Sequence, residues 1–160
     1  MAQDTLPDLT HGERLLLFGF RALAYELGAC PLVRRAFHQA CGAAGAETLN
    51  ALEVFVRELA RHGRRRVTLG VPGSLPLSRD EQLILALFAA AQAEDYPRLE
   101  AHLAWLLADP PRPPFAAAAC LVAQAFSFNG LVLRVPDMAP GPEARETSEV
   151  VVPFRRRAAV

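Results

Sequence analysis

The sequence predicts a mainly α-helical fold: a single compact domain of about six helices in an orthogonal array or bundle. Its middle and its end also allow a small two-stranded β appendage. Three observations support this prediction. Apolar residues recur at three- and four-residue intervals along most of the chain. Two segments begin with the spacing of a capping box. Alanine and leucine, which favour helices, supply much of the apolar content.

The first helix is predicted from about His11 to Leu27. Thr10 and Glu13 have capping-box spacing, in which each side chain accepts a hydrogen bond from a backbone N–H at the helix start. Gly28 is a natural C-terminal stop. The apolar stripe that faces the core is Leu16, Phe20, Leu23 and Leu27.

The second and third helices are separated by a short glycine-containing loop. Pro31 suits the first position of a helix that runs to about Cys41. The third helix is predicted from about Ala46 to His62, where Gly63 ends it. Its apolar stripe is Leu49, Leu52, Phe55, Val56 and Leu59.

The helical pattern is interrupted in the middle of the chain. Val67 to Leu69 is predicted as a short strand, and the turn after it suggests a hairpin that reaches Leu77. Ser78 and Glu81 repeat the capping-box spacing and begin a fourth helix, to about Gln92, that is apolar on nearly every side. Such a pattern is typical of a central, buried helix.

Two further helices and a second strand follow. Asp95 is the predicted cap of a fifth helix, and the sixth is predicted from about Phe115 to Phe128. Leu131 to Val135 is predicted as a strand that pairs with Val67 to Leu69. The predicted organisation is a flexible N-terminus over 1–9, a helical domain over 10–135 and a mostly flexible tail over 136–160, with a short docking segment near 150–154.

Composition and charge exclude several classes of protein. The formal net charge is zero, so there is no global attraction to nucleic acid or to an anionic membrane. Three cysteines, an odd number, favour a reducing compartment over a disulfide framework. The longest apolar stretch, 115–135, is interrupted by polar residues and glycine, so we expect no membrane span. The expected location is the cytoplasm.

Cys30, His38 and Cys41 are the candidate metal or thiol residues. His38 and Cys41 share a helical face, but a zinc site needs at least three protein ligands. Cys30 lies roughly 15 Å from Cys41 along a straight helix, at about 1.5 Å per residue, so it is poorly placed as the third ligand. Cys30 precedes a helix N-terminus, where the dipole favours a thiolate, so it is the better candidate for a reactive thiol. Packing as small apolar residues is the simpler interpretation.

A cluster of arginines around the end of the third helix is the candidate nucleic-acid site. With the predicted hairpin after it, the cluster has the coarse outline of a winged-helix reader. Two glutamates, Glu53 and Glu58, lie among the arginines, and a solvated helix end is the simpler interpretation. The cluster is Arg57, Arg61, Arg64, Arg65 and Arg66.

The fifth helix carries the candidate interaction surface, Tyr96, His102 and Trp105. The Trp and His lie beside the inward-facing leucines, so a half-exposed Trp is expected there, either closing the rim of the core or contacting a partner.

The sequence contains no phosphate-binding, dinucleotide-binding, nucleophile-elbow or metalloprotease motif, so no cofactor is predicted and catalysis is the less favoured interpretation. The leading hypothesis is a non-catalytic interaction or regulatory protein that self-associates or docks a protein partner. Nucleic-acid binding and a metal or thiol site are the alternatives.

Overall fold

The computed structural model describes residues 9–63, 66–70, 77–107, 113–134 and 151–152. Within these residues the chain is mainly α-helical, which confirms the predicted fold class. The α-helices are α1 (His11–Ala24), α2 (Pro31–Cys41), α3 (Gly45–His62), α4 (Arg79–Gln92), α5 (Tyr96–Leu106) and α6 (Pro113–Phe128). The shorter elements are the 3-10 helix η2 (Gly42–Ala44) and the strands β1 (Val67–Thr68) and β2 (Val151–Val152).

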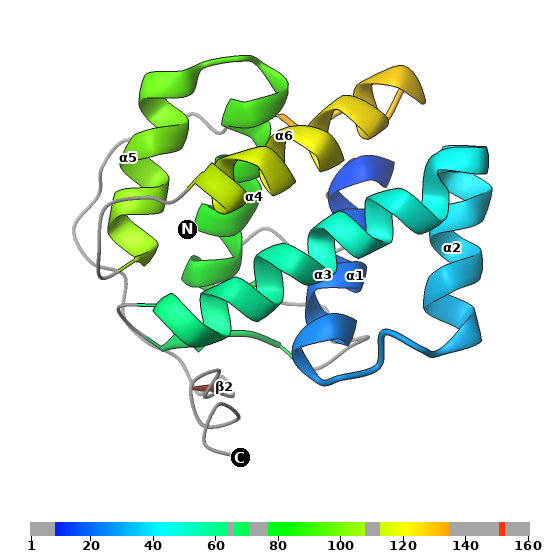
Figure 1. The fold of residues 1–160 in the computed structure, drawn as a ribbon, viewed down its shortest axis with the longest axis horizontal. Coiled ribbons are helices and arrows are strands. Elements are labelled where there is room, and N and C mark those ends of the chain that lie inside the picture. Colours follow the sequence, from blue (N-terminus) through cyan, green and yellow to red (C-terminus); the bar gives the residue numbers. More distant parts are fainter. Residues whose placement is uncertain (1–8, 64–65, 71–76, 108–112, 135–150, 153–160) are drawn as a thin grey trace.

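The helices form a layered, crossing array. Helices α3 and α6 make the most extensive pair, and Figure 1 shows them running diagonally across the view in front of α1 and α4. Helix α2 packs against α3, and α5 packs against α4. In this view α3 and α6 run along similar diagonals and cross the helices behind them.

Both predicted capping boxes are present. At the start of α1, Glu13 N–H donates to Thr10 Oγ1 (3.1 Å) and Thr10 N–H donates to Glu13 Oε1 (3.0 Å). At the start of α4, Ser78 and Glu81 make the same two bonds at 3.0 and 2.9 Å. Each box satisfies backbone donors that the first turn of a helix leaves without a partner.

The predicted end of the first helix is wrong by three residues. Helix α1 ends at Ala24, and Glu26 adopts a left-handed conformation with φ 64°. Leu27 N–H then donates to Ala22 O at 2.7 Å, the bond that closes a Schellman motif, and the Leu27 side chain is left 45% exposed. The prediction failed because this position is usually glycine, and the nearest glycine, Gly28, lies two residues later. Helix α4, which ends at Gln92, is followed by the same kind of turn, with Glu94 in the left-handed conformation at φ 59°.

Replacing Glu26 with glycine is expected to stabilise the protein by about 1 kcal/mol, because an L-residue pays for the left-handed conformation and glycine does not. Urea unfolding followed by circular dichroism measures the change. As a control, the same replacement at exposed Glu53, in the interior of α3, should destabilise by roughly 0.5–1 kcal/mol. Equal effects at the two positions would contradict the prediction.

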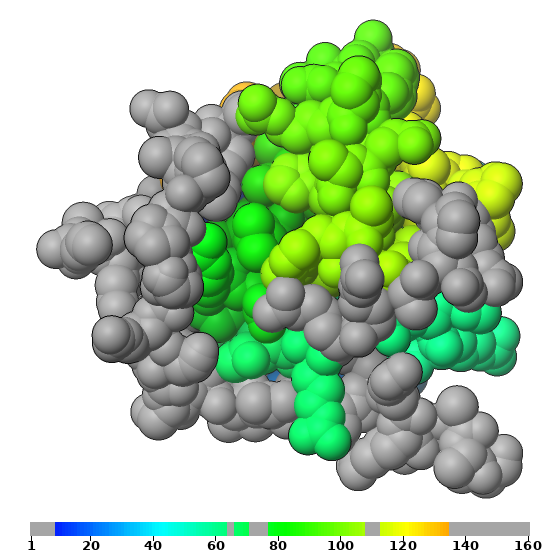
Figure 2. Space-filling model, turned by 90° about the vertical axis from the view of Figure 1, so that its left-hand side faces the viewer, coloured from blue at the N-terminus to red at the C-terminus, as the bar shows by residue number. Residues whose placement is uncertain are grey.

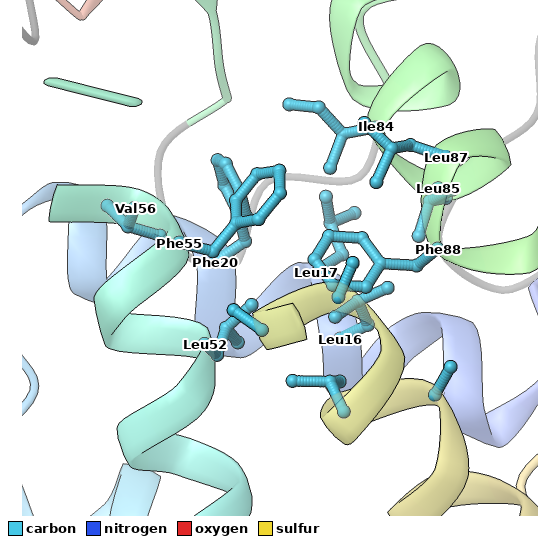
Figure 3. Close-up of a cluster of buried hydrophobic side chains, with 14 of the residues drawn as sticks. Leu16, Leu17, Phe20, Leu52, Phe55, Val56, Ile84, Leu85, Leu87 and Phe88 are labelled. Carbon is cyan, nitrogen blue, oxygen red and sulfur yellow. The ribbon is translucent and has the colours of Figure 1, made fainter. Parts of the chain in front are cut away.

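The core between the two layers is built around Phe55 of α3. Its ring lies 5.0 Å from the ring of Phe88, 5.4 Å from that of Phe115 and 6.3 Å from that of Phe20, centroid to centroid. These four rings come from four different helices, and Figure 3 shows three of them converging between α1, α3 and α4. The Phe55 cluster therefore fixes how the layers sit on each other.

A buried ion pair ties α1 to α4. Arg21 Nε and Nη2 donate to Glu81 at 2.7 and 2.9 Å, and the two side chains are 2% and 0% exposed. Glu81 also accepts a bond from Gly70 N–H at 2.8 Å, which attaches the segment after β1. The carboxylate that closes the second capping box thus also neutralises a buried arginine.

The chain after α6 is attached in the same manner to the first capping box. Glu13 accepts bonds from the backbone and guanidinium of Arg134, at 2.7 and 2.8 Å, and Thr10 Oγ1 donates to Val132 O at 2.6 Å. The Gln92 side chain donates to Leu131 O at 2.9 Å and accepts from Leu133 N–H at 2.8 Å. Side chains therefore make the hydrogen bonds to the backbone of this extended segment that a neighbouring strand would otherwise make.

The predicted pairing of Val67–Leu69 with Leu131–Val135 is wrong. Strand β1 pairs antiparallel with β2, with Val67 opposite Val152 and Thr68 opposite Val151. Residues 131–134 are occupied by the side-chain bonds just described, and Val135 lies outside the described residues. So do the predicted turn of the hairpin, most of the predicted flexible N-terminus and most of the predicted tail.

The Glu13 carboxylate makes stability depend on pH. Burial raises the pKa of Glu13, but hydrogen bonds from Arg134 and Thr10 outweigh it, so the pKa lies below its ordinary value of 4.5. A lowered folded-state pKa stabilises the fold above about pH 4.5, and this contribution is lost as the pH falls through the folded-state value. Glu13→Gln should therefore lower the urea midpoint at pH 7 more than at pH 3. An equal loss at both pH values would show that ionisation of Glu13 contributes nothing.

Candidate functional site

A groove of about 480 Å³ opens where α4 ends and α5 begins, against one side of α6. The Schellman turn at Glu94 and the cap at Asp95, whose carboxylate accepts from Arg98 N–H at 3.3 Å, bring the two helices together there. Figure 2 shows the atoms of α5 (green) and of α6 (yellow) beside each other at the surface. The groove is lined by Ala91, Gln92, Glu94, Tyr96, Cys120, Ala123, Gln124, Ser127 and Phe128.

The solvent-facing side of α6, which borders this groove, is uncharged. None of the 16 residues of α6 is charged, whereas the five other described α-helices all carry charged residues. Leu121 is 37% exposed and Phe128 is 88% exposed. We define the α6 face as the exposed stripe formed by Pro114, Ala117, Leu121, Gln124 and Phe128.

The sequence prediction missed the α6 face. It expected a surface that self-associates or docks a protein partner, but it placed the candidate interaction residues on the fifth helix and named none on the sixth. The signal was present, because the five residues of the face are spaced by three and four, as the a and d positions of a heptad are. A second stripe on the same helix, which includes Phe115, Ala119, Val122 and Phe126, packs into the core.

The three residues of the predicted interaction surface lie on two flanks of α5. At about 100° per residue, Tyr96 is separated by roughly 120–180° from His102 and Trp105 around the helix. Tyr96, 51% exposed, lines the groove beside the α6 face. His102 and Trp105 are half-buried on the other flank, and burial followed by the charge of Arg98 lowers the pKa of His102. Tyr96 alone therefore joins the groove.

The candidate metal and thiol residues do not gather into one site. Within the described residues there is no group of three His, Cys, Asp or Glu side chains that could hold a metal ion. Cys41 is buried, and Cys30 is half-buried at the N-cap of α2. His38 is exposed and lines a second groove, of about 410 Å³, with Arg34 of α2 and Asn50 and Glu53 of α3.

The three thiols differ in their surroundings. Burial raises the pKa of Cys41, and the hydrogen bond with Thr48 offsets only part of the rise. Burial and the charge of Glu94 raise the pKa of Cys120. Because the thiolate is the reactive form, iodoacetamide at neutral pH should label Cys30 at least about 10-fold faster than Cys41. Peptide mass spectrometry measures the rates, and labelling of Cys41 at the rate of Cys30 would contradict the prediction.

The arginine cluster is only partly within the described residues. Arg57, Arg61 and Arg66 are exposed, while Arg64 and Arg65 lie outside the described residues. Glu58 lies 3.8 Å from Arg61 and 3.4 Å from His62, so acidic and basic side chains alternate on this end of α3. Nucleic-acid binding at this cluster remains a prediction.

Comparison with known proteins identifies no relative. No protein family, no curated protein and no solved structure matches the chain. In the part of the chain that the structure describes, every helix is too short or too polar to cross a membrane.

Proposed function

We propose that this chain is a non-catalytic helical interaction protein that binds another protein chain through the α6 face. The observation that carries the proposal is the uncharged, solvent-facing side of α6, with Phe128 88% exposed. Single exposed apolar residues are common on protein surfaces, but a whole helix face without charge is not. Burying a phenylalanine side chain contributes about 1.5–3 kcal/mol, so burial of Phe128 against a partner would stabilise a complex substantially.

The composition around the face supports a protein as the ligand. The central parts of protein–protein interfaces are depleted in charged residues and enriched in aromatic ones, and their rims are polar. Here Leu121 lies in the middle of the face and Phe128 at its end. Tyr96 of α5 adds an aromatic residue to the groove, which Glu94 and Ser127 also line. The groove beside the face offers a pocket for an apolar side chain of the partner.

Comparative co-purification tests the proposal. The bait is the full chain as wild type, as a face variant (Leu121→Asp, Phe128→Ser) and as a control variant (Leu32→Asp). Leu32 is 66% exposed but lies on α2, so the control removes an exposed apolar residue elsewhere. A differently tagged copy of this chain is expressed together with the bait, so that self-association is detected as well.

We expect at least one protein, or the second copy, to bind the wild type and the control but not the face variant. Direct binding of that species after purification, with the same dependence on the face, is required as confirmation. The proposal is wrong if every species that binds the wild type also binds the face variant.

A further inference from the structure

We infer that the partner of the α6 face is a second copy of this chain, packed antiparallel through the same face. This inference rests on the proposed function and specifies its partner. The spacing of the exposed residues, their sizes and their lack of charge support a second copy as the partner.

The spacing of the α6 face is nearly symmetric about Leu121. Pro114 and Phe128 lie seven residues before and after it, and Ala117 and Gln124 lie four before and three after. A twofold dimer is isologous, which means that the same surface on both copies must complement itself. An antiparallel pair of α6 helices centred on Leu121 meets this condition, since each residue then lies opposite its counterpart across the centre.

The sizes of these counterparts are complementary. In the antiparallel pair, Gln124 of one copy faces Ala117 of the other, and Phe128 faces Pro114. Each contact combines a larger side chain with a smaller one, which lets facing layers interdigitate. A parallel pair would instead place Phe128 against Phe128 and Ala117 against Ala117. Two large side chains would then meet at one level of the interface and two small ones at another, which packs less well.

The lack of charge distinguishes α6 from the other described helices as a self-complementary surface. The exposed face of α2 carries Arg34 and Arg35. If two copies of the chain paired through α2, the arginines of one copy would lie close to those of the other. The opposition of like charges in an interface costs several kcal/mol. The α6 face has no such cost against its own copy, because all its residues are uncharged.

The size of the surface predicts a weak dimer. Helix α6 has 16 residues. At about 1.5 Å per residue it is roughly 24 Å long. One helix pair with flanking contacts buries less than the roughly 800 Å² per partner of a standard interface, so we expect dissociation constants in the micromolar range.

Sedimentation velocity of the purified full chain tests the inference between about 1 and 300 µM, a range that brackets micromolar affinity. The wild type and Leu32→Asp should shift from monomer to dimer with concentration. Leu121→Asp should dimerise at least about 100-fold more weakly, because it places two carboxylates opposite each other at the centre. Leu121 is 37% exposed, and retention of the circular dichroism spectrum checks that this variant folds.

Bis-maleimide cross-linking tests the orientation, in a background with the three native cysteines replaced (Cys30→Ser, Cys41→Ala, Cys120→Ser). Leu121→Cys should cross-link to itself. A mixture of Ala117→Cys and Gln124→Cys chains should cross-link to each other more than either does to itself. Preferential self-cross-linking of Ala117→Cys would indicate a parallel pair and overturn the inference.

The outcomes separate this inference from the proposed function. A wild type that stays monomeric over the whole range, or a dimer that Leu121→Asp leaves intact, overturns the second copy as partner. If a different protein still depends on Leu121 and Phe128 for binding, the proposed function stands without this inference. If nothing depends on them, both are wrong.

Discussion

Replacing Glu81 with glutamine is expected to lower the free energy of unfolding by about 3–5 kcal/mol, a large part of the stability of a domain of this size. The substitution preserves the shape of the side chain but removes its charge. Arg21, whose side chain is 2% exposed, would then lose the negative charge of Glu81 that lies 2.7 Å from its Nε. Chemical unfolding followed by circular dichroism at pH 7 measures the loss.

The expected loss is large because one carboxylate serves several parts of the fold. Glu81 receives two bonds from Arg21, one from Gly70 N–H and one from Ser78 N–H. Ser78 in turn donates to Thr68 O at 2.6 Å. The start of α4, the strand β1 and helix α1 are therefore connected through a single buried group.

Two controls identify the cause of the loss. Glu13→Gln removes the carboxylate of the other capping box, but its partner Arg134 is 52% exposed, so a loss of only about 1 kcal/mol is expected at that more solvated pair. The double variant Arg21→Met, Glu81→Gln removes both charges, so it should be more stable than Glu81→Gln alone if the buried charge of Arg21 causes the loss. A loss below 1 kcal/mol for Glu81→Gln would show that the pair is not needed.

This network shows where sequence reasoning succeeds and where it ends. The capping box of Ser78 and Glu81 is a local pattern, so the sequence predicted it correctly. Its partner Arg21 lies 60 residues away, and an arginine on an amphipathic helix is usually solvent-exposed. Nothing within the first helix distinguishes Arg21 as buried. Contacts between distant segments require the fold.

The candidate site was missed for a related reason. Helix α6 is apolar around most of its circumference, and such a pattern does not tell which side faces the core. The packing of α3 and α4 against α6 decides that Leu121 and Phe128 face outward. On α5, conversely, the sequence grouped Tyr96 with Trp105 by proximity along the chain, although the helix turns them to different flanks. In both cases the three-dimensional arrangement selects the surface.

The second large effect is expected at the centre of the core. Replacing Phe55 with alanine should lower the free energy of unfolding by about 3–5 kcal/mol. The side chain is 0% exposed and its ring contacts those of Phe20, Phe88 and Phe115, so that the neighbours cannot close the cavity without moving whole helices. Thermal and urea unfolding measure the loss.

Phe128→Ala is the matched control, because it makes the same change of side chain at a position that is 88% exposed. It should change the stability of the monomer by no more than about 0.5 kcal/mol at low protein concentration. Because Phe128 contributes to the proposed dimer contact, the same variant should lose stability relative to the wild type as the concentration rises, since association stabilises the folded state by mass action. Comparable losses for Phe55→Ala and Phe128→Ala at low concentration would contradict the assignment of one ring to the core and the other to the binding surface.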